Sequence, residues 1–408
     1  MTAPGPVTVL KFGGSSFIEL SDYAVVAKYV IGLLGSSRTR IVVVVSGMSG
    51  SSGRLLEAAL SIDPGLQPQV QDQVLATAEM VSTGFLRAAL HAAGCPATDL
   101  WAPHLGIRSD RTATLAKIVS IDPRPLHDAL REYPVVVVAG GQAVDADNRI
   151  TMLGRNSSDL TAVALAASLQ AGRCDIFGDT PGIFTADPHV VPAARLLPQL
   201  TYRQCGAMSE SGAKVLHWGA VRYAQEHGVI VRCRRLDAAL TGEGPDGTTV
   251  GTGPGETAVV GDTRAGVYRL PPSCDVDAVV EALRDVNLLA HPIVQDGAAM
   301  LVFPAGQRPE QALTDLGVAA EPVDGYGMVS VVEPDGTATR WLVARDKVNA
   351  TVVAEHERRY GASAAAGHAP VAAKARSPHS GLLLGSAAPA GSAGALTDVS
   401  RERPCGSS

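Results

Sequence analysis

Short, almost wholly apolar runs, each followed by a loop of small residues, recur through the first half of the chain. Val7–Phe12, Ile41–Val45 and Pro134–Ala139 lead into the sequences GGSS, SGMSG and GG. A strand buried on both faces of a parallel sheet has this composition, whereas a strand with one solvent-facing side alternates apolar and polar residues. These runs therefore predict buried parallel strands.

Segments with apolar residues at helical spacing lie between and after these strands. The predicted helices are Asp22–Leu34, Gln69–Ala93 and Asp159–Ala171, and a fourth strand follows at Cys174–Phe177. Alternation of strands and helices indicates an α/β layer fold with a mainly parallel sheet. Ligands bind such folds at the carboxyl ends of the strands, so the glycine-rich loops should gather along one rim.

The length of 408 residues predicts two to three domains, at roughly 150 residues each. A stretch rich in Gly, Thr and Pro at Leu236–Glu256 suggests a boundary, giving a first domain over 1–255. Residues 361–408 are mostly Ala, Gly, Ser and Pro, which predicts a disordered tail.

The segment between the boundary and the tail, 256–360, has a different pattern of elements. We expect strand, helix, strand, strand, helix and strand, the order of a ferredoxin-like α+β module. The ranges are Ala265–Leu270, Val276–Arg284, Leu288–Gln295, Ala298–Phe303, Pro309–Leu316 and Gly327–Val332.

Composition excludes several classes of protein. Hydrophobic residues make up 46% and charged residues 18%, which argues against a highly charged disordered chain. Aromatic residues are 4% and the net charge is -6, which disfavours nucleic-acid binding. Six cysteines without a C-x-x-C pair favour a reduced, cytoplasmic protein. Without a signal-like N-terminus or an apolar run of about 20 residues, we expect neither secretion nor membrane insertion.

The first chemical motif is the sequence KFGGSS, from Lys11 to Ser16. Glycines let backbone N–H groups approach a phosphate, and the lysine supplies positive charge where phosphoryl oxygens become more negative. Neither the P-loop spacing nor G-x-G-x-x-G is present, which disfavours P-loop NTPases and dehydrogenases. A tight strand-to-helix turn with a surface lysine is the alternative interpretation.

Three further motifs lie downstream. In GRNSSD, residues 154–159, the serines and Asp159 could simply cap a helix, but a guanidinium such as Arg155 suits a carboxylate or phosphate. In DTPGIFTADP, residues 179–188, two loop aspartates could lie beside a nucleotide, or the segment could form two successive turns. In SGAKVLH, residues 211–217, Lys214 lies beside small residues, although most lysines are simply solvated.

Taken together and in this order, the motifs resemble those of aspartate kinases, in the amino acid kinase superfamily, over about residues 7–255. The second glycine loop, VSGMSG at 45–50, belongs to the same pattern. The resemblance implies a three-layer αβα amino acid kinase fold, ATP and Mg²⁺ as cofactors, and a C-terminal ACT-type module. It also implies an ATP-dependent transfer to the side-chain carboxylate of L-aspartate, as in the synthesis of lysine and threonine, in a homodimer joined through the C-terminal module.

The resemblance also implies roles for individual residues. The catalytic residues would be Lys11, Asp159 and Lys214. The amino acid would be bound by Ser46, Ser52, Glu79, Arg155 and Ser158, with Arg155 on its carboxylate and Glu79 on its amino group. ATP would be bound by Lys11, Gly13, Gly14, Ser15, Gly47, Asp179, Phe184, Asp187, His189 and Lys214. Mg²⁺ would be held by the nucleotide phosphates, without dedicated protein ligands.

Several positions depart from the family pattern, notably Ala78, Ser157, Gly178, His189 and Trp218. His189 replaces an arginine that contacts nucleotide phosphates, which removes a permanent charge and could make ATP binding pH-dependent. These departures leave open a paralogue that acts on another amino acid or an aspartate-like carboxylate. A non-catalytic, amino-acid-sensing subunit is a further alternative, and residues 259–360 are shorter than a pair of ACT modules needs.

Overall fold

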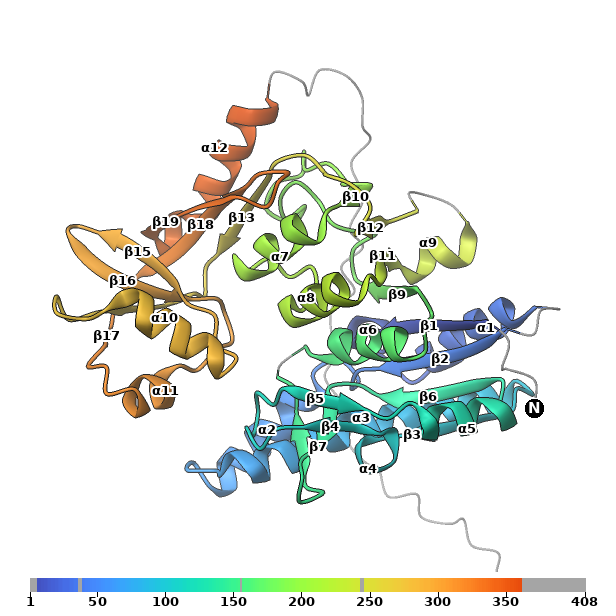
Figure 1. Cartoon of the computed structure of the whole chain (residues 1–408). Helices are drawn as coiled ribbons and strands as arrows, with labels where there is room; N and C mark the ends of the chain where they lie inside the picture. The colour runs from blue at the N-terminus through green and yellow to red at the C-terminus, as the bar shows by residue number, and fades with distance from the viewer. Residues whose placement is uncertain (1–5, 36–38, 155, 243–245, 362–408) are drawn as a thin grey trace, which may run out of the picture. The chain divides into compact units, whose positions relative to one another are not determined.

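The structure is a computed structural model that describes residues 6–35, 39–154, 156–242 and 246–361 (Figure 1). Its centre is an eight-stranded sheet in the order β10-β12-β11-β9-β1-β2-β6-β3. All neighbours in it are parallel except β11 and β12, which confirms the mainly parallel sheet. The strands are β1 (Val7–Phe12), β2 (Arg40–Val45), β3 (Ala97–Leu100), β6 (Val135–Ala139), β9 (Arg173–Gly178), β10 (Gln199–Leu200), β11 (Ile230–Arg235) and β12 (Thr248–Val250).

Both faces of this sheet are buried, as the apolar composition of its strands predicts. Alternate residues of β1 and β2 enter two separate cores: Val9 and Val42 lie in one, Leu10 and Val43 in the other. Helices α5, α6, α7 and α8 cover the first face, and α1, α3 and α9 the second. The prediction of a three-layer αβα fold is therefore confirmed. The helices are α1 (Asp22–Leu34), α3 (Pro68–Ala92), α5 (Arg124–Glu132), α6 (Ser158–Ser168), α7 (Tyr202–Glu210), α8 (Trp218–His227) and α9 (Leu236–Thr241).

A smaller sheet in the order β5-β4-β7-β8 leads directly into the arginine motif at 154–159, because β8 ends at Met152. Its strands are β4 (Ile107–Ser109), β5 (Ile118–Ile121), β7 (Gln142–Val144) and β8 (Ile150–Met152). The remaining helices of this part are η1 (Gly14–Ser16), α2 (Ser51–Ile62) and α4 (Ala102–Leu105).

Beyond residue 255 the expected ferredoxin-like unit is present, with one correction. Its antiparallel sheet has the order β15-β16-β14-β17. The closing strand is the two-residue β17, and the assignment of Gly327–Val332 to this unit was wrong, because that segment pairs elsewhere. The elements are β14 (Gly266–Arg269), α10 (Val276–Asp285), β15 (His291–Gln295), β16 (Ala298–Phe303), α11 (Glu310–Asp315) and β17 (Glu321–Pro322).

A second antiparallel sheet, in the order β13-β18-β19, encloses the ferredoxin-like unit in sequence. Its strands are β13 (Ala258–Asp262), β18 (Tyr326–Val332) and β19 (Ala338–Ala344), followed by η2 (Arg345–Lys347) and α12 (Val348–Tyr360). A Cβ at Gly261 would lie 2.7 Å from Val352, so glycine lets α12 lie close against β13. We call this sheet together with α12 the partial second unit.

Among the described residues, no helix is long and apolar enough to cross a membrane. The cysteines within the described ranges, Cys95, Cys174, Cys205, Cys233 and Cys274, are all free thiols. The predicted boundary near residue 255 falls between β12 and β13 and stays a prediction. The predicted tail lies outside the described residues, apart from Gly361.

Candidate active site

The centre of the site is a buried ion pair between the first motif and the arginine motif. The Nζ atom of Lys11 lies 2.7 Å from Oδ1 of Asp159, and the two side chains are 11% and 10% exposed. Lys11 follows Leu10 on β1, so strand alternation turns it toward the face that α6 covers. Asp159 lies in the first turn of α6, where the positive end of the helix dipole favours a carboxylate. The structure therefore brings Lys11 and Asp159 together as predicted.

Glycines from two adjacent loops form the floor beside this ion pair. A Cβ on Gly13 would lie 3.3 Å from Nζ of Lys11, and one on Gly14 would lie 3.1 Å from the Gly47 carbonyl oxygen. A Cβ on Gly47 would lie 2.9 Å from that of Ala78. Ser15, in η1, is exposed at the same loop. The three glycines bring no side chain of their own to this floor, which lets a ligand such as a phosphate approach the backbone closely.

Glu79 is buried on α3 directly beneath the second glycine loop. Its Oε1 atom accepts a hydrogen bond from the Gly47 N–H at 3.3 Å, while its Oε2 atom is buried without a partner among the described residues. Burial raises the pKa of the Glu79 carboxyl to about 7. An acid held this way needs a cationic partner to be stably ionised, and a bound ammonium group would supply one.

The serines of the predicted substrate site also converge. The Ser46 hydroxyl donates to Oγ of Ser158 at 3.1 Å, which joins the end of β2 to the start of α6. Ser52 lies in the first turn of α2, and its Oγ would lie 3.3 Å from a Cβ on Gly47. A Cβ on Gly140 would lie 2.5 Å from that of Ser158, so the third glycine loop closes against the same helix. The loops that follow β1, β2 and β6 thus meet at one rim.

Arg155 lies outside the described residues, so its predicted contact with the amino acid stays a prediction. The loop around it is constrained: Gly154 has a φ of 108° and Asn156 a φ of 58°. The Ser157 hydroxyl closes the loop by donating to the Gly154 carbonyl oxygen at 2.7 Å. These positive φ values suit a glycine and an asparagine in those positions.

Lys214 is exposed, in the loop between α7 and α8, and within the described residues no ion pair joins it to Asp159. Its charge instead acts on Asp262 of β13: burial raises the pKa of Asp262, and the charges of Arg264 and Lys214 offset part of that rise. The same loop reaches the ion pair through its backbone, because the His217 N–H donates to Oδ2 of Asp159 at 3.1 Å.

The predicted nucleotide loop follows β9. Asp179, Asp187 and His189 are exposed, and the His189 N–H donates to Oδ1 of Asp187 at 2.9 Å. Phe184 is buried and pairs with Leu196 in an isolated antiparallel bridge. Its side chain therefore belongs to the core of this segment, and the aspartates and the histidine form its exposed part. No cluster of three or more His, Cys, Asp or Glu side chains among the described residues could hold a metal ion.

Two buried residues of the site had no role in the sequence interpretation. Asp72 on α3 accepts hydrogen bonds from the N–H groups of Thr114, at 2.9 Å, and Met152, at 3.1 Å, and burial raises its pKa to about 6. It thereby anchors β8 two residues before Gly154. Burial lowers the pKa of His217 to about 4, and its Nδ1 atom has no partner among the described residues. The sequence did offer a signal for Asp72, because it is an aspartate within the helical pattern of apolar residues.

Comparison with known proteins shows which family the sequence resembles. The family model for the amino acid kinase family matches residues 6–234. An aspartokinase of Mycolicibacterium smegmatis is 37% identical over 229 residues, 56% of this chain and 54% of the relative. An aspartate kinase of Pseudomonas putida is 38% identical over 224 residues, 55% of this chain and 54% of the relative. The chain thus matches about half the length of these curated relatives.

The solved structures extend the likeness of fold beyond the kinase segment. E. coli aspartokinase III in complex with aspartate and ADP matches with a TM-score of 0.70 at 18% identity, covering 87% of this chain and 100% of that one. At 18% identity, this match shows a shared fold and nothing more. The shared fold extends over the kinase segment and the part beyond residue 255. With a family model that matches more than half of its residues, the chain belongs to the amino acid kinase family.

Proposed function

We propose that the protein phosphorylates the side-chain carboxylate of L-aspartate with ATP, giving 4-phospho-L-aspartate and ADP. The observation that carries this proposal is the buried Glu79 carboxyl, whose Oε2 atom has no partner among the described residues, beside the glycine floor and the Lys11–Asp159 pair. In this arrangement an ammonium group would bind at the Glu79 carboxyl, and phosphates would bind at the adjacent glycine floor and Lys11. The sequence relatives with these motifs bear the names aspartokinase and aspartate kinase.

The nucleotide side supplies positioning and charge, which is most of what phosphoryl transfer requires. Lys11 would neutralise the charge that develops on the transferred group, and Asp159 would hold the lysine in place. Gly13, Gly14 and Gly47 would border the phosphates with backbone. In this structure the N–H groups of Gly13 and Gly47 donate to the Phe177 carbonyl oxygen and to Glu79, so they would have to exchange these partners to bind phosphate. The exposed loop of Asp179, Asp187 and His189, with Ser15 and Lys214, would enclose the rest of ATP, whereas the buried Phe184 would support this loop from within.

The residues present fit Mg²⁺ bound through the nucleotide. The glycine floor lies beside the Lys11–Asp159 pair, where the nucleotide phosphates would bind. The cation would be held by phosphate oxygens and would reduce their negative charge.

The amino acid would bind on the other side of Lys11. Glu79 would accept the α-ammonium group, and Arg155 would hold the α-carboxylate with two parallel hydrogen bonds. Ser46, Ser52 and Ser158 surround the intervening space and would orient the side-chain carboxylate toward the phosphate. Such a two-point grip distinguishes an α-amino acid from a simple carboxylic acid.

The proposal also covers the pathway, the cellular location and the role of the C-terminal part. The product would enter the synthesis of lysine and threonine in the cytoplasm, which agrees with free thiols at the described cysteines. The ferredoxin-like unit and the partial second unit would serve as ACT-type modules and join two copies of the chain. The division into a kinase domain over 1–255 and a regulatory or dimerisation part over 256–360 is proposed with it.

A hydroxamate assay tests the proposal, because hydroxylamine traps an acyl phosphate. Purified protein with Mg²⁺-ATP should give the hydroxamate from aspartate, and more slowly or not at all from other amino acids. Turnover of a different amino acid would instead identify a paralogue with another substrate. Absence of any affinity for Mg²⁺-ATP in calorimetry would contradict both kinase interpretations and favour a sensing subunit.

A further inference from the structure

The predicted nucleotide loop is one arm of a small hairpin. Thr185 donates its N–H to the Arg195 carbonyl oxygen at 2.9 Å, and Leu197 donates its N–H to the Ile183 carbonyl oxygen at 2.8 Å. With the bridge between Phe184 and Leu196, these bonds define the nucleotide hairpin, residues 183–197. Asp187 and His189 lie at its turn, a few residues from the paired arms.

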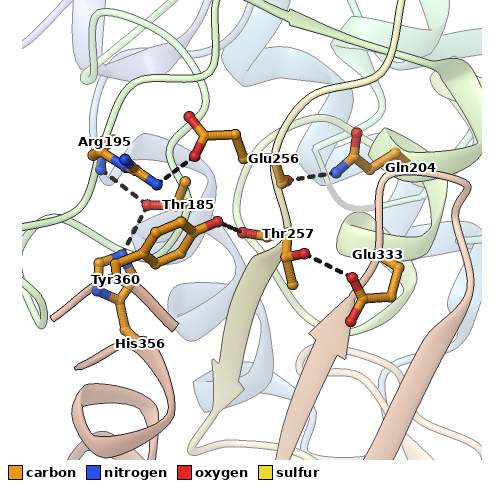
Figure 2. Close-up of polar contacts among 8 residues, drawn as sticks. All are labelled: Thr185, Arg195, Gln204, Glu256, Thr257, Glu333, His356 and Tyr360. Carbon is orange, nitrogen blue, oxygen red and sulfur yellow. Dashed lines mark hydrogen bonds and ion pairs between the residues drawn. The ribbon is translucent and has the colours of Figure 1, made fainter. Parts of the chain in front are cut away.

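Thr185 ties this hairpin to the C-terminal part of the chain. Its carbonyl oxygen accepts from the Val259 N–H of β13 at 2.7 Å, and its hydroxyl oxygen accepts from the Arg195 N–H at 2.9 Å. The same hydroxyl lies 2.9 Å from Nε2 of His356 on α12, as Figure 2 shows. Thr185 and His356 are 0% and 1% exposed, so water cannot substitute for this bond.

A second contact joins the other arm of the hairpin to the same helix. The Arg195 guanidinium lies over the Tyr360 ring, 4.1 Å from its centroid, and forms an ion pair with Glu256 (Figure 2). The Tyr360 hydroxyl donates to the Thr257 carbonyl oxygen at 2.5 Å. His356 and Tyr360 are four residues apart and thus share one face of α12, which holds both arms.

Apolar side chains also attach the turn of the hairpin to α12. Ala186 and Val191, which flank Asp187 and His189, belong to one buried cluster with Val348 and Val352 of α12. Burial lowers the pKa of His356, and the nearby charge of Arg195 lowers it further, so the ring is neutral and suited to a hydrogen bond with a hydroxyl.

We propose that His356 and Tyr360 are positioning residues for the nucleotide, which act by holding the hairpin of Asp187 and His189 through Thr185 and Arg195. The inference rests on the proposed role of this hairpin in ATP binding. His356 contacts Thr185 and Tyr360 contacts Arg195, so the paired arms transmit the effect of each to Asp187 and His189. Helix α12 is then a functional part of the kinase site, although it is the last described element of the chain.

The test uses the full chain with His356→Leu, which removes the hydrogen bond, and His356→Gln, which retains a polar group near Thr185. We expect His356→Leu to raise the KM for Mg²⁺-ATP about five- to tenfold, the effect of losing one buried hydrogen bond, with the KM for aspartate unchanged within about twofold. His356→Gln should restore part of the ATP affinity. Arg358→Ala, on the exposed side of α12, is the matched control and should change neither KM.

Amide hydrogen exchange provides a readout that does not depend on catalysis. Exchange in residues 183–197 should accelerate in His356→Leu and in Tyr360→Leu, which removes the ring over Arg195 and serves should the His356→Leu variant not fold. Unchanged exchange in the hairpin of His356→Leu and Tyr360→Leu, or equal loss of affinity for ATP and aspartate, would overturn the inference. If the unmodified chain binds no Mg²⁺-ATP, the proposed function fails, while the exchange data still decide whether α12 holds the hairpin.

Discussion

The two halves of the candidate site are supported in different ways. On the proposed amino acid side, the Gly47 N–H donates to Glu79 and the Ser46 hydroxyl donates to Ser158, and all four residues come from the first 255. On the nucleotide side, loops of the kinase segment rest on residues from beyond position 255 (Figure 2). The proposed substrate half is therefore held by the sheet and its helices, whereas the hairpin of the proposed nucleotide half also rests on the C-terminal part of the chain.

The segment that leads from α7 to Lys214, here called the lysine loop (residues 211–217), is also held by the C-terminal part of the chain. Arg340 of β19 donates from Nε to the Ser211 hydroxyl at 3.1 Å, and Nε2 of His291 lies 2.6 Å from the Glu210 carbonyl oxygen. Lys214 follows three residues after Ser211. Both the nucleotide hairpin and the segment that leads into Lys214 are thus held by side chains from beyond position 255.

The largest effect should come from the ion pair shared by both halves. Lys11→Ala removes the charge at the transferred phosphate and leaves Asp159 buried without its partner. We expect kcat to fall about 10³-fold, with a loss of stability of about 3 kcal/mol. Hydroxamate kinetics and thermal unfolding measure the two effects. Lys28→Ala, at an exposed position of α1, is the control, and full activity in Lys11→Ala would refute the proposed chemistry.

A change on the amino acid side should leave ATP unaffected. Glu79→Gln removes the partner of the ammonium group, so the KM for aspartate should rise about 30-fold, as for a charged hydrogen bond. The KM for ATP should stay within about twofold of the original value. Equal increases in both constants would show that the two halves are not separate.

The same variant should become more stable. Burial raises the pKa of Glu79 to about 7 from 4.5, so its ionisation opposes folding once the pH exceeds the unfolded value. Glu79→Gln should therefore stabilise the fold at pH 8 by up to about 3 kcal/mol, and this gain should vanish toward pH 4.5. Denaturant unfolding at the two pH values measures the difference; a pH-independent change would mean that Glu79 is not the cause.

The pH dependence of the original protein gives a smaller, complementary test. Only ionised Glu79 can pair with the ammonium group, so the KM for aspartate should rise as the pH falls through about 7, approaching tenfold per pH unit. Above that pH the constant should level off. The Glu79→Gln variant should lack this dependence between pH 6 and about pH 8, and its persistence there would assign it to another group.

The smallest effect should come from the lysine loop. Arg340→Ala removes one partly buried hydrogen bond to Ser211, and we expect the KM for ATP to rise about threefold with little change in that for aspartate. Titration with each substrate in the hydroxamate assay separates the two constants. A larger effect on aspartate would contradict the division of the site into two halves.

Much of the fold and the site followed from local sequence. The valine-rich strands, their glycine loops and the placement of Lys11 and Asp159 were predictable, because burial on both faces demands continuous apolar runs and parallel strands end at one rim. The roles of Lys214 and His189 toward ATP stay predictions. Local sequence patterns indicate which secondary structure a segment favours. In these strands and loops, that secondary structure agrees with the one in the fold.

The tertiary structure decided what depends on contacts between distant segments. The pairing of β13 with β18 across the whole ferredoxin-like unit left no periodic signal, and so Gly327–Val332 was placed in the wrong sheet. The anchoring of β8 by Asp72, and of Thr185 by His356 over 171 residues, is equally invisible in either segment alone. Sequence by itself determined which residues could perform the chemistry. Only folding decided which distant side chains hold them in place, because burial and hydrogen bonding are properties of pairs and not of single segments.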